Sequence, residues 1–138
     1  MAEHKWAGLR AKILPANGDP LTSGSSMTVR LDRLSLNTAD ATLAEDSTTI
    51  WLQKEGPWRL TAALKLTGDT DALSEVELHT LINWDKYSTI DSSLISFQTI
   101  SIADIISVPR GGAAVGLQIS SVVGMVALRG GYVILEQA

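Results

Sequence analysis

Histidine and cysteine, the side chains best suited to acid-base and nucleophilic chemistry near neutral pH, are scarce in this chain of 138 residues. The chain has two histidines and no cysteine. A Ser-His-Asp site would have to use His79, because His4 lies in the N-terminal segment ahead of the predicted strands. His79 shares one face of a predicted strand with Glu75 and Glu77, which is typical of a solvated histidine. The sequence also lacks a nucleophile elbow, a phosphate-binding loop and a zinc-binding His-Glu-x-x-His motif. It therefore predicts a non-enzymatic protein with no catalytic residue and no cofactor.

Acidic side chains gather at two predicted loops. Asp69 and Asp71 follow Gly68 and offer carboxylate oxygens, but Ca²⁺ takes about six to eight oxygen ligands, and this tip supplies too few alone. A polar hairpin tip whose aspartates bond their own backbone is the favoured interpretation. Residues 40–46 form a second acidic loop, which we interpret as solvated. No metal site is predicted, and whether any calcium binds near Asp69 and Asp71 stays open.

Aromatic residues provide the candidate contact sites. Trp84-Asp85-Lys86-Tyr87 places two aromatics beside polar groups at a strand end, where they would stack on a sugar or anchor a protein contact. Trp84 also continues the inward face of its predicted strand, which favours a core position. Trp6 and Leu9 would attach the N-terminus to a neighbouring subunit or make an ordinary edge contact. The candidate partner or subunit contacts are Trp6, Leu9, Trp84, Tyr87 and Phe97.

Charge and hydropathy exclude several classes of partner. With 11 Lys and Arg against 15 Asp and Glu, the net charge of −4 argues against binding to nucleic acid or anionic lipid. The most apolar stretch, 105–128, is interrupted at 109–112 and 118–121, so it is shorter than the roughly 20 residues of a membrane helix. We expect no membrane insertion. The N-terminal residues also lack a secretory signal, so we expect no export by that route.

Most of the chain has a strand period. Apolar residues alternate with polar ones over 58–66 and again over 76–84, as in half-buried strands. Residues 27–37 change their apolar phase near Asp32-Arg33, and we interpret them as one long bent strand with a bulge at that point.

Three further strands are predicted after residue 112, at 115–119, 122–128 and 132–136, with a turn at Arg129-Gly130-Gly131. The remaining strand candidates are 8–14, 49–53 and 93–107, the last with one short helical turn. Turn signals lie at 17–20, 55–57, 68–71 and 109–112. The predicted fold is all-β, an antiparallel β-sandwich of about eight to ten strands. One domain spans 1–138, with about residues 1–8 as a candidate N-terminal arm.

The order of these features resembles the C1q/TNF-like jelly roll. The resemblance rests on the early strand 29–32, on 50–52 leading to the glycine and aromatic of 56–62, on the late turn and strand 108–117, and on the closing strand 131–135. It covers about residues 27–136. It implies a jelly-roll sandwich that assembles as a homotrimer.

Hydropathy supports an assembly independently. Hydrophobic residues make up 45% of the chain, whereas a sandwich has one interior layer roughly 10 Å thick to fill. The surplus lies in 94–106 and 122–128, which are apolar on both faces, and contact between copies would cover it. The alternative is that these are central strands covered within one chain.

A module of this type without a stalk looks like the small trimeric proteins of bacteriophage virions. We therefore predict a homotrimeric minor tail protein, an attachment or adaptor module at the tail tip or fibre, located in the virion and assembled in the host cytoplasm. Its expected partners are its own copies, other virion proteins and, as a candidate, a host-surface glycan. One alternative is a capsid decoration protein at a local threefold. Another is a carbohydrate-binding module that uses Trp84 and Tyr87.

Overall fold

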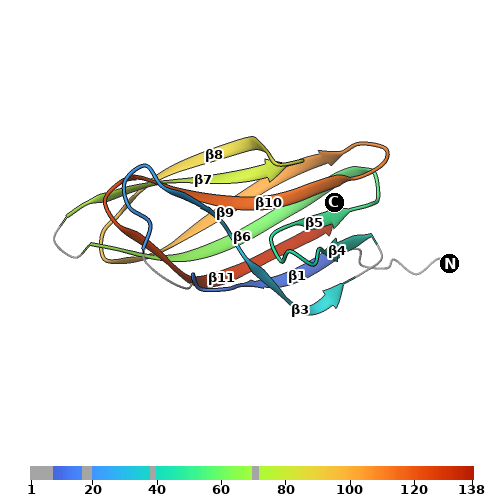
Figure 1. Cartoon of the computed structure of the whole chain (residues 1–138). Helices are drawn as coiled ribbons and strands as arrows, with labels where there is room; N and C mark the ends of the chain where they lie inside the picture. Colours follow the sequence, from blue (N-terminus) through green and yellow to red (C-terminus); the bar gives the residue numbers. More distant parts are fainter. Residues whose placement is uncertain (1–7, 17–19, 38–39, 70–71) are drawn as a thin grey trace.

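Every regular element among the described residues is a β-strand (Figure 1). The computed structural model describes residues 8–16, 20–37, 40–69 and 72–138. The strands are β1 (Gly8–Ile13), β2 (Ser26–Thr28), β3 (Leu31–Asn37), β4 (Ala41–Leu43), β5 (Ile50–Leu52), β6 (Gly56–Gly68), β7 (Ser74–Ile82), β8 (Asp85–Leu94), β9 (Phe97–Val108), β10 (Ala113–Val123) and β11 (Val126–Gln137). None of the described segments forms a helix of the length and apolarity that crossing a membrane takes.

The strands form two antiparallel sheets that pack face to face (Figure 1). The five-stranded sheet has the order β3-β1-β11-β6-β9 and the six-stranded sheet contains β4-β5-β10-β7-β8, with β2 also paired to β10. The predicted all-β sandwich is confirmed. The described residues hold eleven strands, slightly more than predicted, because β2 and β4 are pieces of only three residues.

The core lies between the sheets and follows from the alternation in the sequence. On β6 the inward side chains are all buried: Trp58, Leu60, Ala62, Leu64 and Leu66. Burying each of the large ones stabilises the fold by about 1.5–3 kcal/mol. Trp58 satisfies its polar group by donating from Nε1 to the Lys54 carbonyl at 2.9 Å, so the indole fits a dry interior.

Polar contacts join the two sheets where β8 and β9, their edge strands, come together. Thr80 and Ser88 of the six-stranded sheet both donate to Asp104 Oδ2 on β9, at 2.9 and 2.7 Å. The Tyr87 hydroxyl donates to the Ile105 carbonyl at 3.0 Å. Bonds to a charged acceptor are stronger than neutral ones, so this side of the sandwich is closed by hydrogen bonds rather than by apolar packing alone.

Residues 27–37 form two strands in different sheets, which corrects the prediction of one bent strand. Val29 N donates to the Leu117 carbonyl of the six-stranded sheet, whereas Leu31 pairs with Ile13 of the five-stranded sheet. The chain crosses between the sheets at residues 29–30. The expected irregularity near Arg33 is present, because the register of β3 against β1 shifts just beyond it.

The C-terminal part contains two long strands rather than the predicted three. The turn lies at Gly124, which has φ +85°, and the chain then runs continuously as β11. Arg129-Gly130-Gly131 is a bulge inside β11, not a turn. Gly131 has φ +138° and lies against the Ala63 backbone, where a Cβ would overlap the carbonyl oxygen. Glycines here bend a strand without ending it.

The sequence patterns did not predict two of the strands, β4 and the long edge strand β8. β8 reads DKYSTIDSSL and pairs on one side with β7 alone, so polar residues occupy both of its faces and hide the period of two. The helical turn expected within 93–107 is absent, because Leu94 ends β8 and Ile95-Ser96 turns into β9. Residues 1–7, 17–19 and 70–71 lie outside the described residues, and with them most of the predicted arm and parts of two predicted turns.

Candidate functional site

His79 is buried, which corrects the prediction of a solvated histidine. Its side chain is 1% exposed although it lies on the outer face of the six-stranded sheet, since its neighbours Leu78 and Thr80 point into the sandwich. β7 lies between β8 and β10, and His79 pairs with Thr89 on one side and Gln118 on the other. The alternation in the sequence indicates that His79 lies on the outer face of its strand. It does not show that neighbouring side chains cover the imidazole.

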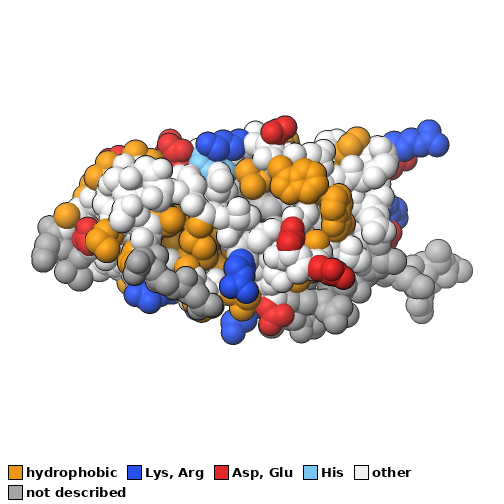
Figure 2. Space-filling view, viewed as in Figure 1, with side chains coloured by type: hydrophobic (Ala, Val, Ile, Leu, Met, Phe, Trp, Pro, Cys, Tyr) orange, Lys and Arg blue, Asp and Glu red, His pale blue; other side chains and the backbone are white. Residues whose placement is uncertain are grey.

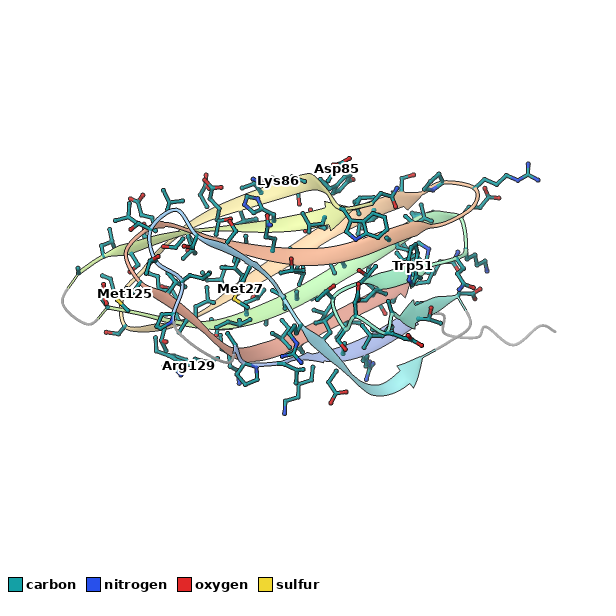
Figure 3. All side chains as sticks on the ribbon, in the orientation of Figure 1. Met27, Trp51, Asp85, Lys86, Met125 and Arg129 are labelled. Carbon is teal, nitrogen blue, oxygen red and sulfur yellow. The ribbon has the colours of Figure 1, made fainter. Side chains whose placement is uncertain are left out.

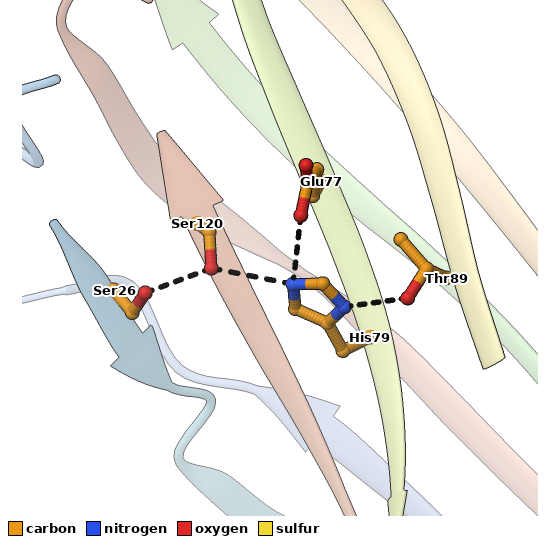
Figure 4. A network of polar contacts seen from close by, with 5 residues as sticks. All are labelled: Ser26, Glu77, His79, Thr89 and Ser120. Carbon is orange, nitrogen blue, oxygen red and sulfur yellow. Dashed lines mark hydrogen bonds and ion pairs between the residues drawn. The ribbon is translucent and has the colours of Figure 1, made fainter. Parts of the chain in front are cut away.

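The contacts of His79 do not form a nucleophilic relay (Figure 4). Its Nδ1 lies 2.8 Å from Thr89 Oγ1, while Ser120 Oγ and Glu77 Oε2 both approach Nε2, at 3.3 and 3.4 Å. A Ser-His-acid relay needs the hydroxyl and the carboxylate on opposite ring nitrogens. Ser120 Oγ also contacts Ser26 Oγ at 2.8 Å. The cluster is thus a hydrogen-bonded patch across four strands, β2, β10, β7 and β8.

Burial lowers the pKa of His79, and the positive charge of Lys86 lowers it further. The carboxylates of Glu77 and Asp91 act in the opposite direction. The neutral imidazole is therefore favoured in the folded chain at neutral pH.

Trp84 occupies the tip of the β7–β8 hairpin and is 64% exposed, which corrects its predicted place in the core. Asn83 and Trp84 both have positive φ, 50° and 67°, as two-residue hairpin turns of type I′ require. Asn83 suits this conformation, but a bulky residue such as Trp84 adopts it only at a cost in energy. The turn is fixed to β10, because Asn83 N donates to the Ala114 carbonyl at 2.7 Å and Ala114 N donates to Asn83 Oδ1 at 2.9 Å.

Trp84 meets Trp51, a residue the sequence analysis did not select. The ring centroids lie 5.8 Å apart with an interplanar angle of 76°, an edge-to-face arrangement, and Trp51 is 41% exposed. We call this pair the tryptophan corner; Figure 3 labels Trp51 at its end of the sandwich. Trp51 stands between buried Ile50 and Leu52 on β5. The alternation of residues along this strand could have predicted that Trp51 points outward.

A small recess of about 80 Å³ adjoins the tryptophan corner. Hydroxyl, aliphatic and backbone groups line it: Thr28, Thr48, Thr49, Leu81, Trp84, Ala114, Val115 and Gly116. Figure 2 shows orange side chains gathered over this part of the face. Gly116 permits the close approach of the loop before β5, since a Cβ there would lie 3.1 Å from the Thr48 carbonyl oxygen.

Asp46 shapes the loop that forms one wall of the recess. Its Oδ1 accepts hydrogen bonds from Thr48 N and Thr49 N at 2.9 and 3.1 Å, and its Oδ2 accepts one from Thr49 Oγ1 at 3.1 Å. The bond from Thr48 N is the main reason that the pKa of Asp46 is lowered, with burial acting against it. Glu45 and Asp46 are exposed, as predicted for a solvated loop, whereas Ala41–Leu43 within the predicted loop form β4 and Ala41 is buried.

The other predicted contact residues lie in different places. Tyr87 and Phe97 are exposed, but Tyr87 donates to β9 and makes no ring contact with Trp84. Leu9 is fully buried in the core, so it offers no surface to a neighbouring chain. Trp6 lies outside the described residues, as does Asp71 of the candidate calcium tip. No group of three or more His, Asp or Glu side chains among the described residues is placed to hold a metal ion.

The outer face of the five-stranded sheet is uncharged at its centre over β9, β6 and β11, and it is charged on β1, where Lys12 and Arg10 pair in register with Tyr132 and Ile134. Strand register places two rows of small, aliphatic or aromatic side chains across it: Ser101, Ala63 and Tyr132, then Ala103, Thr61 and Ile134. Tyr132 is 45% exposed. Arg59 and Glu136 lie beyond one row, with Arg59 Nη1 3.9 Å from Glu136 Oε1, and Lys65 lies beyond the other. A neutral centre with a charged rim is typical of protein interfaces.

A second apolar surface lies at the end of the sandwich opposite the tryptophan corner, where Figure 3 labels Met125. The connections between β6 and β7, β8 and β9, and β10 and β11 meet there. Six large side chains, each more than two fifths exposed, form this apolar tip: Leu73, Ile95, Phe97, Val122, Val123 and Met125. Five of them belong to the segments in which the sequence predicted surplus apolar residues.

The arrangement of the sheets identifies the fold as a jelly-roll sandwich, and comparisons with known proteins place it more closely. No family model and no curated protein sequence matches the chain. Solved structures of murine APRIL are similar to it. At pH 5.0 the TM-score is 0.64 with 9% identity, at pH 8.5 it is 0.63 with 10%, and at pH 8.0 it is 0.60 with 10%. In each case the match covers 95% of this chain and 99% of the other. The chain has a TNF-like jelly-roll fold, as the resemblance implied, and at this identity the likeness concerns the fold alone.

Proposed function

We propose that the chain is a non-enzymatic structural protein of a bacteriophage particle, a homotrimeric attachment or adaptor module of the tail tip or fibre. Its work would be binding, through one surface to its own copies and through another to a neighbouring virion protein. The TNF-like jelly-roll fold, shared with solved structures of murine APRIL, is the scaffold to which we assign this binding role. The observation that carries the proposal is the apolar surface left outside the core.

The outer face of the five-stranded sheet is the surface we assign to contact between copies. Its central rows are uncharged over three adjacent strands, β9, β6 and β11, so two copies would meet there without burying an unpaired charge. Tyr132 and Ile105 are large and exposed, and side chains of this size provide most of the energy at protein interfaces. In a closed ring of three copies the contact is head to tail, so this face of each chain would pack against a different surface of the next copy.

The apolar tip is the surface we assign to another virion protein. Its side chains come from three connections at one end of the sandwich, whereas the self-contact face lies along the sheet. Exposed apolar groups that cluster in this way usually mark a contact with another molecule. An adaptor needs two such surfaces, one for its copies and one for its neighbour.

Light scattering coupled to size-exclusion chromatography tests the assembly. One chain has a mass of 14.7 kDa, and we expect three chains per particle at micromolar concentration. A mass of one chain under these conditions would overturn the homotrimer.

Immunogold labelling of virus particles from the source of this chain tests the location. An antibody raised against the purified protein should label the tail tip or fibre. Label spread over the capsid would instead support the decoration protein predicted as the alternative, at the local threefold. Particles without label would remove the virion role altogether.

A further inference from the structure

We propose that the tryptophan corner binds an uncharged saccharide, with a sugar ring stacked on the exposed face of Trp84 and one ring substituent in the adjoining recess. The proposal names the ligand class for the attachment role proposed above and rests on that role for its biological setting. The binding itself does not depend on assembly, because both tryptophans and the recess belong to one chain.

The backbone of Trp84 is the first observation. A residue with φ 67° at the second position of a two-residue turn is usually glycine, and a bulky side chain there is strained. Burial in the core does not offset this strain, because Trp84 is mostly exposed. A strained aromatic residue on the surface is therefore maintained against local stability, which is the pattern of a binding residue.

The rigidity of the corner is the second observation. Asn83, next to Trp84, makes two hydrogen bonds with the backbone of Ala114. Trp51 pairs in register with the same residue, Ala114, across β5 and β10. The backbone beside each ring is thus held at one point of the central strand β10. A site that is ordered before binding loses little entropy when the ligand arrives.

The lining of the recess indicates the chemistry of the ligand. Thr28 and Thr48 supply hydroxyl groups, and Gly116 leaves the backbone open to approach. None of the described residues that line the recess is charged, so an anionic ligand would find no partner there. A sugar has an apolar C–H face for an aromatic ring and hydroxyl groups for the threonines, and a volume of about 80 Å³ suits a substituent rather than a whole ring.

A proline-rich peptide is the competing ligand for exposed tryptophans. Such peptides lie along an extended groove between aromatic side chains. Here the two rings meet edge to face at 76° beside a small recess, which favours a compact ring over an extended chain. In the proposed homotrimer the outer face of the six-stranded sheet stays free, so three corners would face outward and add avidity.

Calorimetric titration of the full chain with chitotriose, maltotriose and mannotriose tests the proposal, together with a glycan microarray. We expect at least one neutral glycan to bind. Trp84→Ala and Trp51→Ala should each weaken that binding by about tenfold or more, which corresponds to a loss of about 1.4 kcal/mol or more per aromatic contact. Trp84→Gly should also lose binding while keeping the fold, because glycine accepts the turn conformation.

Tyr87→Ala is the matched control, an exposed aromatic residue of the same hairpin that does not touch the corner. It should leave binding unchanged. Loss of binding with Tyr87→Ala but not with Trp51→Ala would overturn the assigned site. The absence of any array signal and of heat with all three oligosaccharides would overturn the saccharide, and so would binding of a proline-rich decapeptide alone.

The result for saccharide binding can be distinguished from the result for the homotrimer. A protein with the mass of one chain that still binds a neutral glycan through Trp84 keeps this inference and removes the homotrimer. A trimer that binds no glycan has the opposite meaning.

Discussion

The outer faces of the two sheets are built by the same alternation of side chains but have different character. The five-stranded sheet presents neutral rows around Ala63 and Tyr132 with charges at the margin. The six-stranded sheet presents a buried histidine, the tryptophan corner and an open acidic groove of about 360 Å³ that includes Glu75 and Asp91. The first face is suited to contact with an identical copy, and the second to a polar ligand. In a sandwich, the period of two defines which residues point outward, and their neighbours decide what they do there.

Introducing a charge into the neutral face should have the largest effect. Tyr132→Lys is expected to reduce the assembly to a single chain of 14.7 kDa, because an added ammonium group beside Lys12, its neighbour on β1, would be buried between copies without a partner. Trp51→Lys alters a comparably exposed aromatic residue on the other sheet and should leave the mass unchanged. Light scattering measures both. The comparison fails if the two variants behave alike.

The two sides of β6 should differ strongly in stability. Leu64→Ala removes a buried side chain and should destabilise the fold by about 2–5 kcal/mol. Arg59→Ala, on the outward side with an exposed ion pair, should cost under about 0.5 kcal/mol unless it lies in an interface. Urea denaturation measures both values. Equal values would mean that the outward face of β6 has been misassigned.

At the turn of the tryptophan corner, glycine in place of Trp84 should give a more stable protein than alanine. Trp84→Gly is expected to exceed Trp84→Ala in free energy of unfolding by about 1 kcal/mol, since alanine keeps the strain of a positive φ and glycine does not. Both variants lose the contact with Trp51, so their difference isolates the backbone. Thermal unfolding of the pair measures it, and alanine as the more stable variant would contradict a strained turn.

The smallest expected effect is a pH dependence from His79. Its pKa is lowered in the folded chain from 6.5, so the unfolded state binds more protons as the pH falls. The stability from the neutral histidine is complete above about pH 6.5 and is lost as the pH drops below that value toward the lower folded pKa. His79→Gln should therefore flatten the stability curve between about pH 7.5 and 5.5 relative to the unmodified protein. Parallel curves in denaturant would show that His79 does not contribute.

Sequence periodicity predicted the long strands because each has one face in the core. Residues 58–66 form the centre of β6, and their apolar side chains are buried. The order of the predicted strands indicated the jelly-roll fold. β8 was not predicted, because an edge strand with polar residues on both faces has no such alternation. The bend expected in 27–37 was a change of sheet, since a switch between layers and a bulge alter the apolar phase in the same way.

The candidate site was predicted only in part, for a similar reason. Trp84 was identified as an aromatic contact residue, but its exposure depends on where the hairpin turns. Its neighbour Trp51 is separated from it by more than thirty positions, and only the pairing of β5 and β7 with β10 brings the two together. Tyr87, adjacent in sequence, points instead to β9.

By itself the amino-acid sequence determined an all-β chain with few catalytic groups and more apolar side chains than one sandwich interior holds, because composition and a period of two act locally. The tertiary structure decided which of these side chains remain outside, which strands cross between sheets, and which distant aromatics meet. Those outcomes depend on pairing between strands far apart in the chain, and no local pattern contains that information.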